Sequence, residues 1–280
     1  MPKLIVLLRV KDGIFFIHEW LSCYEKLADE IVVVDNGSTD GTYEILKAHP
    51  KVSSVIRTAV YHEGRDKNLL YNEARKRNPD WCLWVDVDEI FEPQITRLHF
   101  DKLMKRSFIN KYGFRRFHFI DRKYFAGSWF RLNYSSGHDR MMWRESPKGY
   151  FEDFIIDSPN VKGIEGINWR TNFRIKHLGY INKEIVDKKA GLYRTIIPQN
   201  ENIFQEMYLR NERKIKWNDN RKSIDVTMLN LLLNCILLTH PISKIYYKAV
   251  ALFSKKNPAT ISISADQPKE LHENKNALLS

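Results

Sequence analysis

The chain has 280 residues, of which 43% are hydrophobic and 12% aromatic, so it is long enough to bury a sizeable core. Its three cysteines, Cys23, Cys82 and Cys235, are too widely spaced for a zinc site or a disulfide framework, which favours a reducing cytoplasm. The net charge of +11 is typical of proteins that bind nucleic acid, anionic membranes or phosphorylated ligands. No nucleic-acid-binding motif accompanies that charge, and no signal peptide is recognised, so we expect a cytoplasmic protein without a nucleic-acid partner.

The first ninety residues alternate between strand and helix patterns. Apolar, β-rich runs predict strands over 4–10, 30–34, 52–57 and 81–85. Helical spacing between them predicts helices over 13–27, 42–48 and 67–77. This order predicts an α/β fold with a mostly parallel central sheet and right-handed crossovers. Ligands of such sheets lie beyond the carboxyl ends of the strands, where Arg9, Asp35, Arg57 and Asp86 fall.

The pattern changes from about residue 95. We expect a helix over 95–105, an exposed or edge strand over 112–120, and short strands with long loops over 121–175. After Tyr180 the sequence becomes helical and basic. The predicted domain covers 1–222, divided into halves at 1–95 and 96–222.

The C-terminal part has a different character. The apolar run 226–238 is shorter than the roughly 20 residues of a membrane span, and a second helix with several lysines is predicted over 242–253. These helices form an amphipathic extension, 223–256, which either packs on protein or lies in a membrane interface. The polar segment 257–280 is predicted to be a flexible tail.

Two acidic motifs follow predicted strands. Asp86-Val87-Asp88-Glu89 places paired carboxylates, one residue apart, directly after an apolar run. Such a pair suits a hard divalent cation, which commonly serves a phosphate-bearing substrate, although a charged loop would have the same composition. The second motif, Asp35-Asn36-Gly37-Ser38-Thr39-Asp40-Gly41-Thr42, is a loop rich in turn formers that also supplies helix N-caps.

Together, in this order and spacing, the two motifs resemble those of the family 2 glycosyltransferases of the GT-A fold. The stretch 8–21 and the run Arg65-Asp66-Lys67-Asn68 resemble the subgroup associated with lipopolysaccharide and capsule assembly. The resemblance covers about residues 3–95 well and extends more weakly to 174–180. It implies that a sugar is transferred from a nucleotide-sugar donor with inversion at the anomeric carbon.

The resemblance also assigns donor-binding roles. Asp88 would be the direct ligand of Mn²⁺ or Mg²⁺, Asp86 would reach the ribose or a metal-bound water, and Asp35 would pair with the nucleobase, usually uracil. His177 matches a histidine that often closes the metal site, although a lone histidine is more commonly structural. Further residues would neutralise the pyrophosphate, unless they are solvated surface charges: Arg9, Arg65 and Lys67.

Inversion requires one general base to deprotonate the acceptor hydroxyl. The resemblance points to the run 150–157, where Asp153 is preferred, followed by Asp157 and Glu152. Asp139 is a further candidate. Alternating charge on an edge strand would give the same pattern.

Two departures from the family pattern affect the expected activity. Many relatives carry Asp-Asp where this chain has Asp35-Asn36, so the family pattern does not fix how this chain recognises the nucleobase. The Gln-x-x-Arg-Trp motif of processive relatives is absent, which favours a single transfer over polymerisation. The basic, amphipathic C-terminus favours a glycan or lipid-linked acceptor in surface polysaccharide assembly, with the enzyme cytoplasmic or peripheral at the inner face of the membrane. The alternatives are a nucleotidyltransferase, a degenerate GT-A scaffold subunit and, on charge alone, a nucleic-acid-binding protein.

Overall fold

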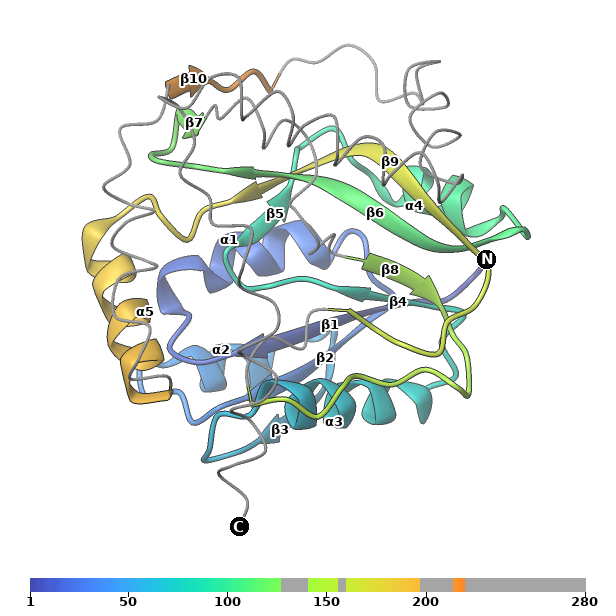
Figure 1. The fold of residues 1–280 in the computed structure, drawn as a ribbon, viewed down its shortest axis with the longest axis horizontal. Helices are drawn as coiled ribbons and strands as arrows, with labels where there is room; N and C mark the ends of the chain where they lie inside the picture. Colours follow the sequence, from blue (N-terminus) through green and yellow to red (C-terminus); the bar gives the residue numbers. More distant parts are fainter. Residues whose placement is uncertain (127–140, 156–159, 197–213, 220–280) are drawn as a thin grey trace, which may run out of the picture. The chain divides into compact units, whose positions relative to one another are not determined.

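An eight-stranded mixed sheet is the centre of the computed structural model, which describes residues 1–126, 141–155, 160–196 and 214–219 (Figure 1). The strand order is β3-β2-β1-β4-β8-β6-β9-β5. The strands are β1 (Leu4–Val10), β2 (Glu30–Asp35), β3 (Val52–Arg57), β4 (Trp81–Trp84), β5 (Glu89–Phe91), β6 (Ile109–His118), β8 (Met141–Arg144) and β9 (Ile167–His177). A small antiparallel pair lies outside this sheet and consists of β7 (Tyr124–Ala126) and β10 (Lys214–Lys216).

The first four strands are mutually parallel, as predicted. In their register Val10 lies opposite Asp35, and Asp35 lies opposite Arg57. On the other side of β1, Leu7 lies opposite Trp84 of β4. The carboxyl ends of these strands therefore meet at one edge of the sheet, and the polar residues that follow them are brought together.

The second half of the sheet is mixed. Strand β8 is antiparallel to both β4 and β6, β6 is parallel to β9, and β9 is antiparallel to β5. The prediction of an exposed or edge strand over 112–120 is wrong, because β6 lies inside the sheet between β8 and β9. Its arginines suggested exposure, but Arg115 donates to Asn172 Oδ1 at 3.0 Å and Arg116 pairs with buried Glu89.

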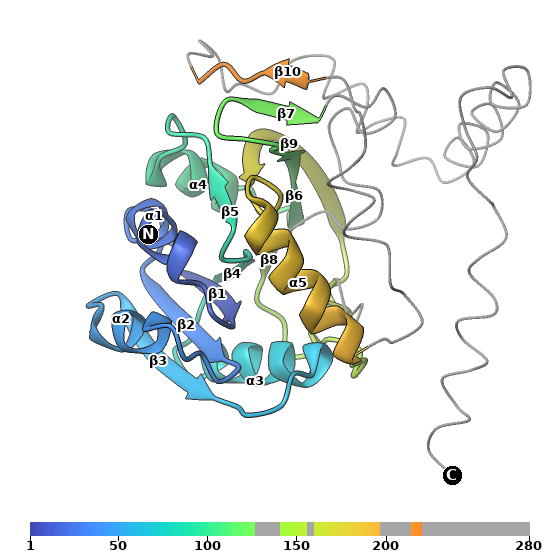
Figure 2. The ribbon, with the colours of Figure 1, turned by 90° about the vertical axis from the view of Figure 1, so that its left-hand side faces the viewer.

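Helices cover both faces of the parallel half (Figures 1 and 2). Apolar side chains of α1 (Ile14–Tyr24), α2 (Thr42–Ala48) and α4 (Arg97–Met104) join one core cluster with alternate residues of β1, β2 and β4. The other face is covered by α3 (Glu63–Arg75) together with Phe151, Val161 and Ile164. Helix α5 (Lys183–Ile196) lies on the side where the parallel strands end, at the left of Figure 1.

Helix α3 begins earlier than the predicted 67–77. His62 caps it, because its side chain accepts a hydrogen bond from the Arg65 N–H at 3.3 Å, and histidine is not among the usual capping residues. The first turn also binds main chain from a distant segment: Gly64 N–H donates to the Phe154 carbonyl at 2.8 Å. A Cβ at position 64 would lie 2.1 Å from the Glu152 carbonyl oxygen, so glycine is required for this close approach.

The predicted extension 223–256 and tail 257–280 lie outside the described residues, as do Asp139 and Asp157. Within the part of the chain that the structure describes, no helix is both long and apolar enough to span a membrane.

Candidate functional site

Asp35 ends β2 as a buried carboxylate with one unused oxygen. Its Oδ1 accepts hydrogen bonds from the N–H groups of Gly37 and Ser38 at 3.1 and 2.9 Å and lies 3.4 Å from Arg57 Nε. Gly37 has a φ of +78°, a left-handed conformation that favours glycine in this turn. The other oxygen, Oδ2, is buried and has no hydrogen-bond partner. A buried oxygen that accepts no hydrogen bond within the protein is able to accept one from an N–H group of a ligand.

The neighbouring Asn36 has a role of its own. Its amide nitrogen donates to Asp66 Oδ2 and to Thr58 Oγ1, both at 2.7 Å. Asp66 is fully buried, so an aspartate at position 36 would place a second carboxylate against it without a donor between them. The contact with Asp66 is therefore a structural reason for an asparagine at position 36 in place of the aspartate of the Asp-Asp pattern. Asp66, the carboxylate that faces Asn36, lies on α3.

Arg65 and Lys67 already have acidic partners. Arg65 donates to Asp66 Oδ1 from Nε and Nη2 at 2.9 and 2.7 Å. Lys67 is fully buried, with Nζ 2.6 Å from Glu63 Oε1 and 4.5 Å above the centre of the Trp84 ring. These contacts balance both positive charges within the protein, and a phosphate-binding role for the two residues stays a prediction.

Arg9 lies at the end of β1 beside the carboxylate motif. Nη2 donates to the Tyr61 hydroxyl at 2.9 Å, the guanidinium lies 4.2 Å from the centre of the Tyr61 ring, and Nη1 is buried without a hydrogen-bond partner. Burial opposes its charge, but nearby Tyr61, Glu63 and Asp86 outweigh that effect and raise the Arg9 pKa. A charged guanidinium with an unpaired N–H group is well suited to bind an anion.

The structure brings Asp88 and His177 together. The 3% exposed Asp88 has its Oδ2 3.6 Å from His177 Nε2, and Lys189 of α5 donates to the same oxygen. The antiparallel pairing of β5 with β9 produces this proximity, because Glu89 lies opposite His177 and Leu178 N–H donates to the Asp88 carbonyl at 2.7 Å.

Two residues without an assigned role in the sequence prediction support this pair. Nδ1 of His118 lies 2.9 Å from Nδ1 of His177, and the parallel register of β6 and β9 places the two histidines opposite each other. Buried Glu89 pairs with Arg116 at 3.1 Å and accepts the Asp86 N–H at 3.2 Å, which fixes the turn between the two aspartates. Glu89 was recognisable as part of the motif, whereas His118 is placed only by strand pairing.

His177 is held in its neutral form. Burial lowers its pKa to about 3, and the nearby charges of Arg116 and Lys189 lower it as well, while Asp88 acts in the opposite direction. One of the two facing Nδ1 atoms must carry a proton. When it is that of His177, the lone pair on Nε2 faces the same space as Asp88 Oδ2, as a metal ligand requires.

Asp88 and His177 could therefore hold a divalent cation through two atoms of suitable chemistry, a carboxylate oxygen and a neutral imidazole nitrogen. Across the described ranges, no group of three or more His, Cys, Asp or Glu side chains is arranged to hold a metal. The remaining ligands of a cation at Asp88 and His177 would have to come from the substrate or from water.

The candidate bases lie on the segment that binds the first turn of α3. Asp153 is 73% exposed, and its Oδ1 is 3.6 Å from His62 Nδ1. Glu152 Oε2 lies 3.4 Å from Lys162 Nζ.

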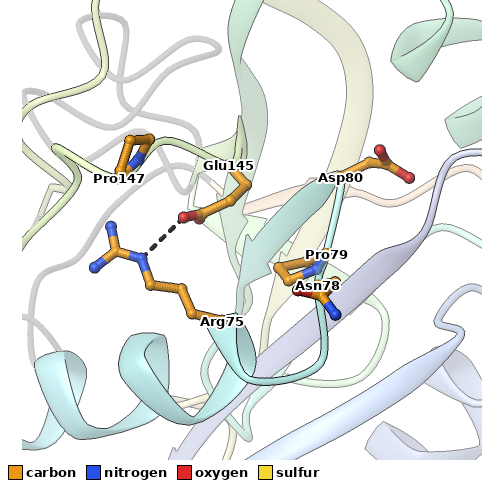
Figure 3. Close-up of a pocket in the computed structure, with 6 residues that line it drawn as sticks. All are labelled: Arg75, Asn78, Pro79, Asp80, Glu145 and Pro147. Atoms are coloured by element: carbon orange, nitrogen blue, oxygen red, sulfur yellow. Dashed lines mark hydrogen bonds and ion pairs between the residues drawn. The ribbon is translucent and has the colours of Figure 1, made fainter.

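A separate cavity of about 510 Å³ lies at the start of β4, at the other end of this strand from the carboxylate motif (Figure 3). It is lined by Arg75, Asn78, Pro79, Asp80, Glu145 and Pro147. Arg75 Nε is 2.9 Å from Glu145 Oε1, and Arg75 also donates to the carbonyls of Ser146 and Gly149. Since Asp80 precedes β4 and Asp86 follows it, this cavity is not part of the carboxylate site.

The chain is similar to proteins of a known family. The model of the family described as glycosyl transferase family 2 matches residues 19–175. Uncharacterized proteins Rv3786c of Mycobacterium tuberculosis and Mb3815c of Mycobacterium bovis are each 38% identical over 76 residues, which cover 24% of this chain and 19% of either relative. The match thus spans about a fifth of the length of these relatives.

Two solved structures are similar at low identity. Residues 1–349 of TarS from S. aureus share 15% identity, with 74% of this chain and 69% of that chain covered and a TM-score of 0.42. The mannosyltransferase PcManGT from Pyrobaculum calidifontis, in complex with GDP-Man and Mn²⁺, shares 13% identity, with 92% and 81% covered and a TM-score of 0.45.

The lowered pKa of His177 predicts a pH-dependent stability. Between the ordinary value of 6.5 and about 3, the unfolded chain binds a proton at His177 that the folded chain does not. The free energy of unfolding should therefore decrease as pH falls from about 7 to about 5, by at most ~1.4 kcal/mol per pH unit for this one proton. Urea denaturation in the presence of a chelator would measure that slope, which His177→Gln should reduce.

The matched control is His18→Gln, since His18 is exposed on α1. The control should keep the slope of the native protein. Equal slopes for native protein and His177→Gln would contradict a neutral, buried His177.

Proposed function

Because the chain belongs to glycosyltransferase family 2, we propose that this GT-A enzyme transfers a single sugar from a nucleotide-sugar donor to an acceptor hydroxyl, with inversion and with a divalent cation at Asp88. The observation that carries the proposal is the grouping of complementary polar atoms at the carboxyl ends of parallel strands: the unused Asp35 Oδ2, the unpaired Arg9 Nη1 and the Asp88–His177 pair. Ligands of open α/β sheets occupy this edge.

The donor would lie across this edge. Asp35 Oδ2 would accept the ring N–H of the nucleobase, uracil in our proposal, and Asp86 would bind the ribose or a metal-bound water. Arg9 would place its charge beside the diphosphate. Asp88 and His177 would hold Mn²⁺ or Mg²⁺, which when bound supplies a Lewis acid that stabilises negative charge on the β-phosphate.

In the proposed reaction the acceptor oxygen forms a bond to the anomeric carbon from the face opposite the leaving group. The bond between that carbon and the β-phosphate oxygen breaks, and its electron pair leaves with the nucleoside diphosphate. The acceptor proton passes to a carboxylate, for which we propose Asp153. Its exposure and its position beside His62 support this choice over Glu152, which faces Lys162.

The donor site predicts metal-dependent nucleotide binding. Isothermal titration of UDP, with GDP in parallel, should give at least about tenfold tighter binding in Mn²⁺ than in a chelator. Asp88→Asn should lose that enhancement, because it removes a charged ligand of the cation. Asp187→Asn, an α5 carboxylate paired with Lys183, is the control and should behave as the native protein. Failure of both nucleotides to bind in Mn²⁺ would contradict the proposed function.

The proposed base predicts a loss of turnover without a loss of donor binding. After a screen of nucleotide sugars has identified a donor that is hydrolysed with water as acceptor, Asp153→Asn should reduce kcat by ~10²–10⁴-fold. UDP affinity in Mn²⁺ should be unchanged, since Asp153 does not contact the donor in this scheme. Glu152→Gln is the neighbouring control. A greater loss of kcat in that variant than in Asp153→Asn would indicate that Glu152 is the general base.

We propose a glycan or lipid-linked acceptor in surface polysaccharide assembly, with the enzyme peripheral at the membrane. The proposal rests on the net charge of +11 and on the apolar, lysine-flanked sequence 223–256. Deletion of 223–280 should abolish co-sedimentation with anionic phospholipid vesicles at low salt, whereas deletion of 257–280 alone should not. Equal co-sedimentation of both truncated proteins would contradict a membrane role for the extension.

A further inference from the structure

We propose that Lys189 is a tethered counter-ion of Asp88 that competes with the divalent cation until the donor diphosphate arrives. The inference rests on the metal role proposed for Asp88. It concerns a residue of α5 that is 101 positions from Asp88 in the sequence and belongs to neither acidic motif.

The contact is made to the oxygen that a cation would use. Lys189 Nζ donates to Asp88 Oδ2, the oxygen that also lies 3.6 Å from His177 Nε2. An ammonium group and a divalent cation cannot both approach one carboxylate oxygen in a buried site, because their mutual repulsion is strong where water is excluded. Asp88 therefore has two alternative positive partners, one of which is part of the chain.

Gly179 leaves the space that the Asp88–Lys189 ion pair occupies. A Cβ at Gly179 would lie 2.4 Å from Asp88 Oδ2 and 2.7 Å from Lys189 Nζ. A side chain at position 179 would thus displace either the carboxylate or the ammonium. Since Gly179 is not among the glycines with positive φ, its importance here is steric.

Lys189 is able to leave Asp88 while α5 stays in place. Its neighbours Val186 and Ala190 are buried at 1% and 5% exposure and hold the helix against the domain. The Lys189 side chain itself is 34% exposed, in contrast to 3% for Asp88. A change of rotamer would move the ammonium toward solvent or toward the diphosphate of a bound donor, without undocking the helix.

This exchange would couple the metal to the donor. A free dication would have to displace Lys189 without providing a new partner for it, whereas a nucleoside diphosphate provides one. The cation would then bind weakly to the free enzyme and tightly together with the donor, so that the metal site is completed only when there is a diphosphate to stabilise.

The test is a titration of Mn²⁺ alone into the full chain, with free Mn²⁺ followed by electron paramagnetic resonance and no nucleotide present. Lys189→Met should bind Mn²⁺ at least about tenfold more tightly than the native protein, because the competing charge is gone. Lys189→Arg retains the charge and should stay within about twofold of the native protein. Lys188→Met is the matched control on the same helix, where Lys188 is 75% exposed and paired with Glu184, and it should also leave Mn²⁺ binding unchanged.

A folded Lys189→Met variant, established by its thermal melt, that binds Mn²⁺ no more tightly than native protein overturns the inference. Should that variant fail to fold, the native protein supplies the second measurement. Acetylation of Lys189 relative to Lys188, quantified by mass spectrometry, should increase in saturating Mn²⁺, and an unchanged ratio overturns the inference as well.

Failure of this inference is distinguishable from failure of the proposed function. Metal-dependent UDP binding by the native protein, together with unaltered Mn²⁺ affinity in Lys189→Met, overturns only the role of Lys189. Tighter Mn²⁺ binding by Lys189→Met, with no nucleotide binding by any form of the protein, supports the competition and overturns the proposed donor.

Discussion

The antiparallel pairing of β5 with β9 is the constraint on which the candidate site depends. Strand β5 begins at Glu89, directly after Asp88, and its partner β9 ends at His177. Because backbone hydrogen bonds set this register, Asp88 is placed beside His177 although 89 positions separate them. The same pairing sets the exit of the chain toward Gly179 and α5. Without this pairing the carboxylate motif would be a loop at the end of β4, with no histidine from the second half of the chain beside it.

Burial of charge is the second constraint, and each buried charge near the site has a specific partner. Glu92 is matched by Arg174 at 2.7 Å, and Asp66 is bound by both Arg65 and Asn36. Removal of one partner from such a pair costs about 3–5 kcal/mol, because the remaining charge is left buried alone. Among the buried side-chain atoms that have no hydrogen-bond partner, Asp35 Oδ2 and Arg9 Nη1 belong to charged groups at the ends of two neighbouring parallel strands.

The sequence predicted the parallel half of the fold well because that half is built from local patterns. Four strands and three helices follow from hydrophobic runs and spacing, and the strand-end positions of Asp35 and Asp86 follow from their order. The start of α3 was missed because His62 replaces a conventional cap. The interior position of β6 was missed because Arg115 and Arg116 are charged residues whose partners lie on other strands.

The residues of the candidate site likewise divide into those that belong to local sequence patterns and those that only the fold brings to the site. Asp35, Asp86 and Asp88 belong to local motifs, and His177 was reached through a resemblance over a short stretch. His118 and Lys189 have no sequence signal of their own, because strand register and the docking of α5 give them their positions. Sequence patterns record neighbours along the chain, and these two residues are neighbours of the site only in space.

The charges around the carboxylate motif explain why the site would bind a metal and a diphosphate together. Three carboxylates lie within four residues at Asp86, Asp88 and Glu89. Each has a cationic neighbour: Arg9 near Asp86, Lys189 on Asp88 and Arg116 on Glu89. A lone dication would bring two further positive charges into a balanced, poorly solvated region, which is unfavourable. A dication that arrives with a diphosphate adds little or no net positive charge, and the released lysine acquires an anionic partner. The ion pairs that stabilise the free enzyme would thereby make donor and cation depend on each other.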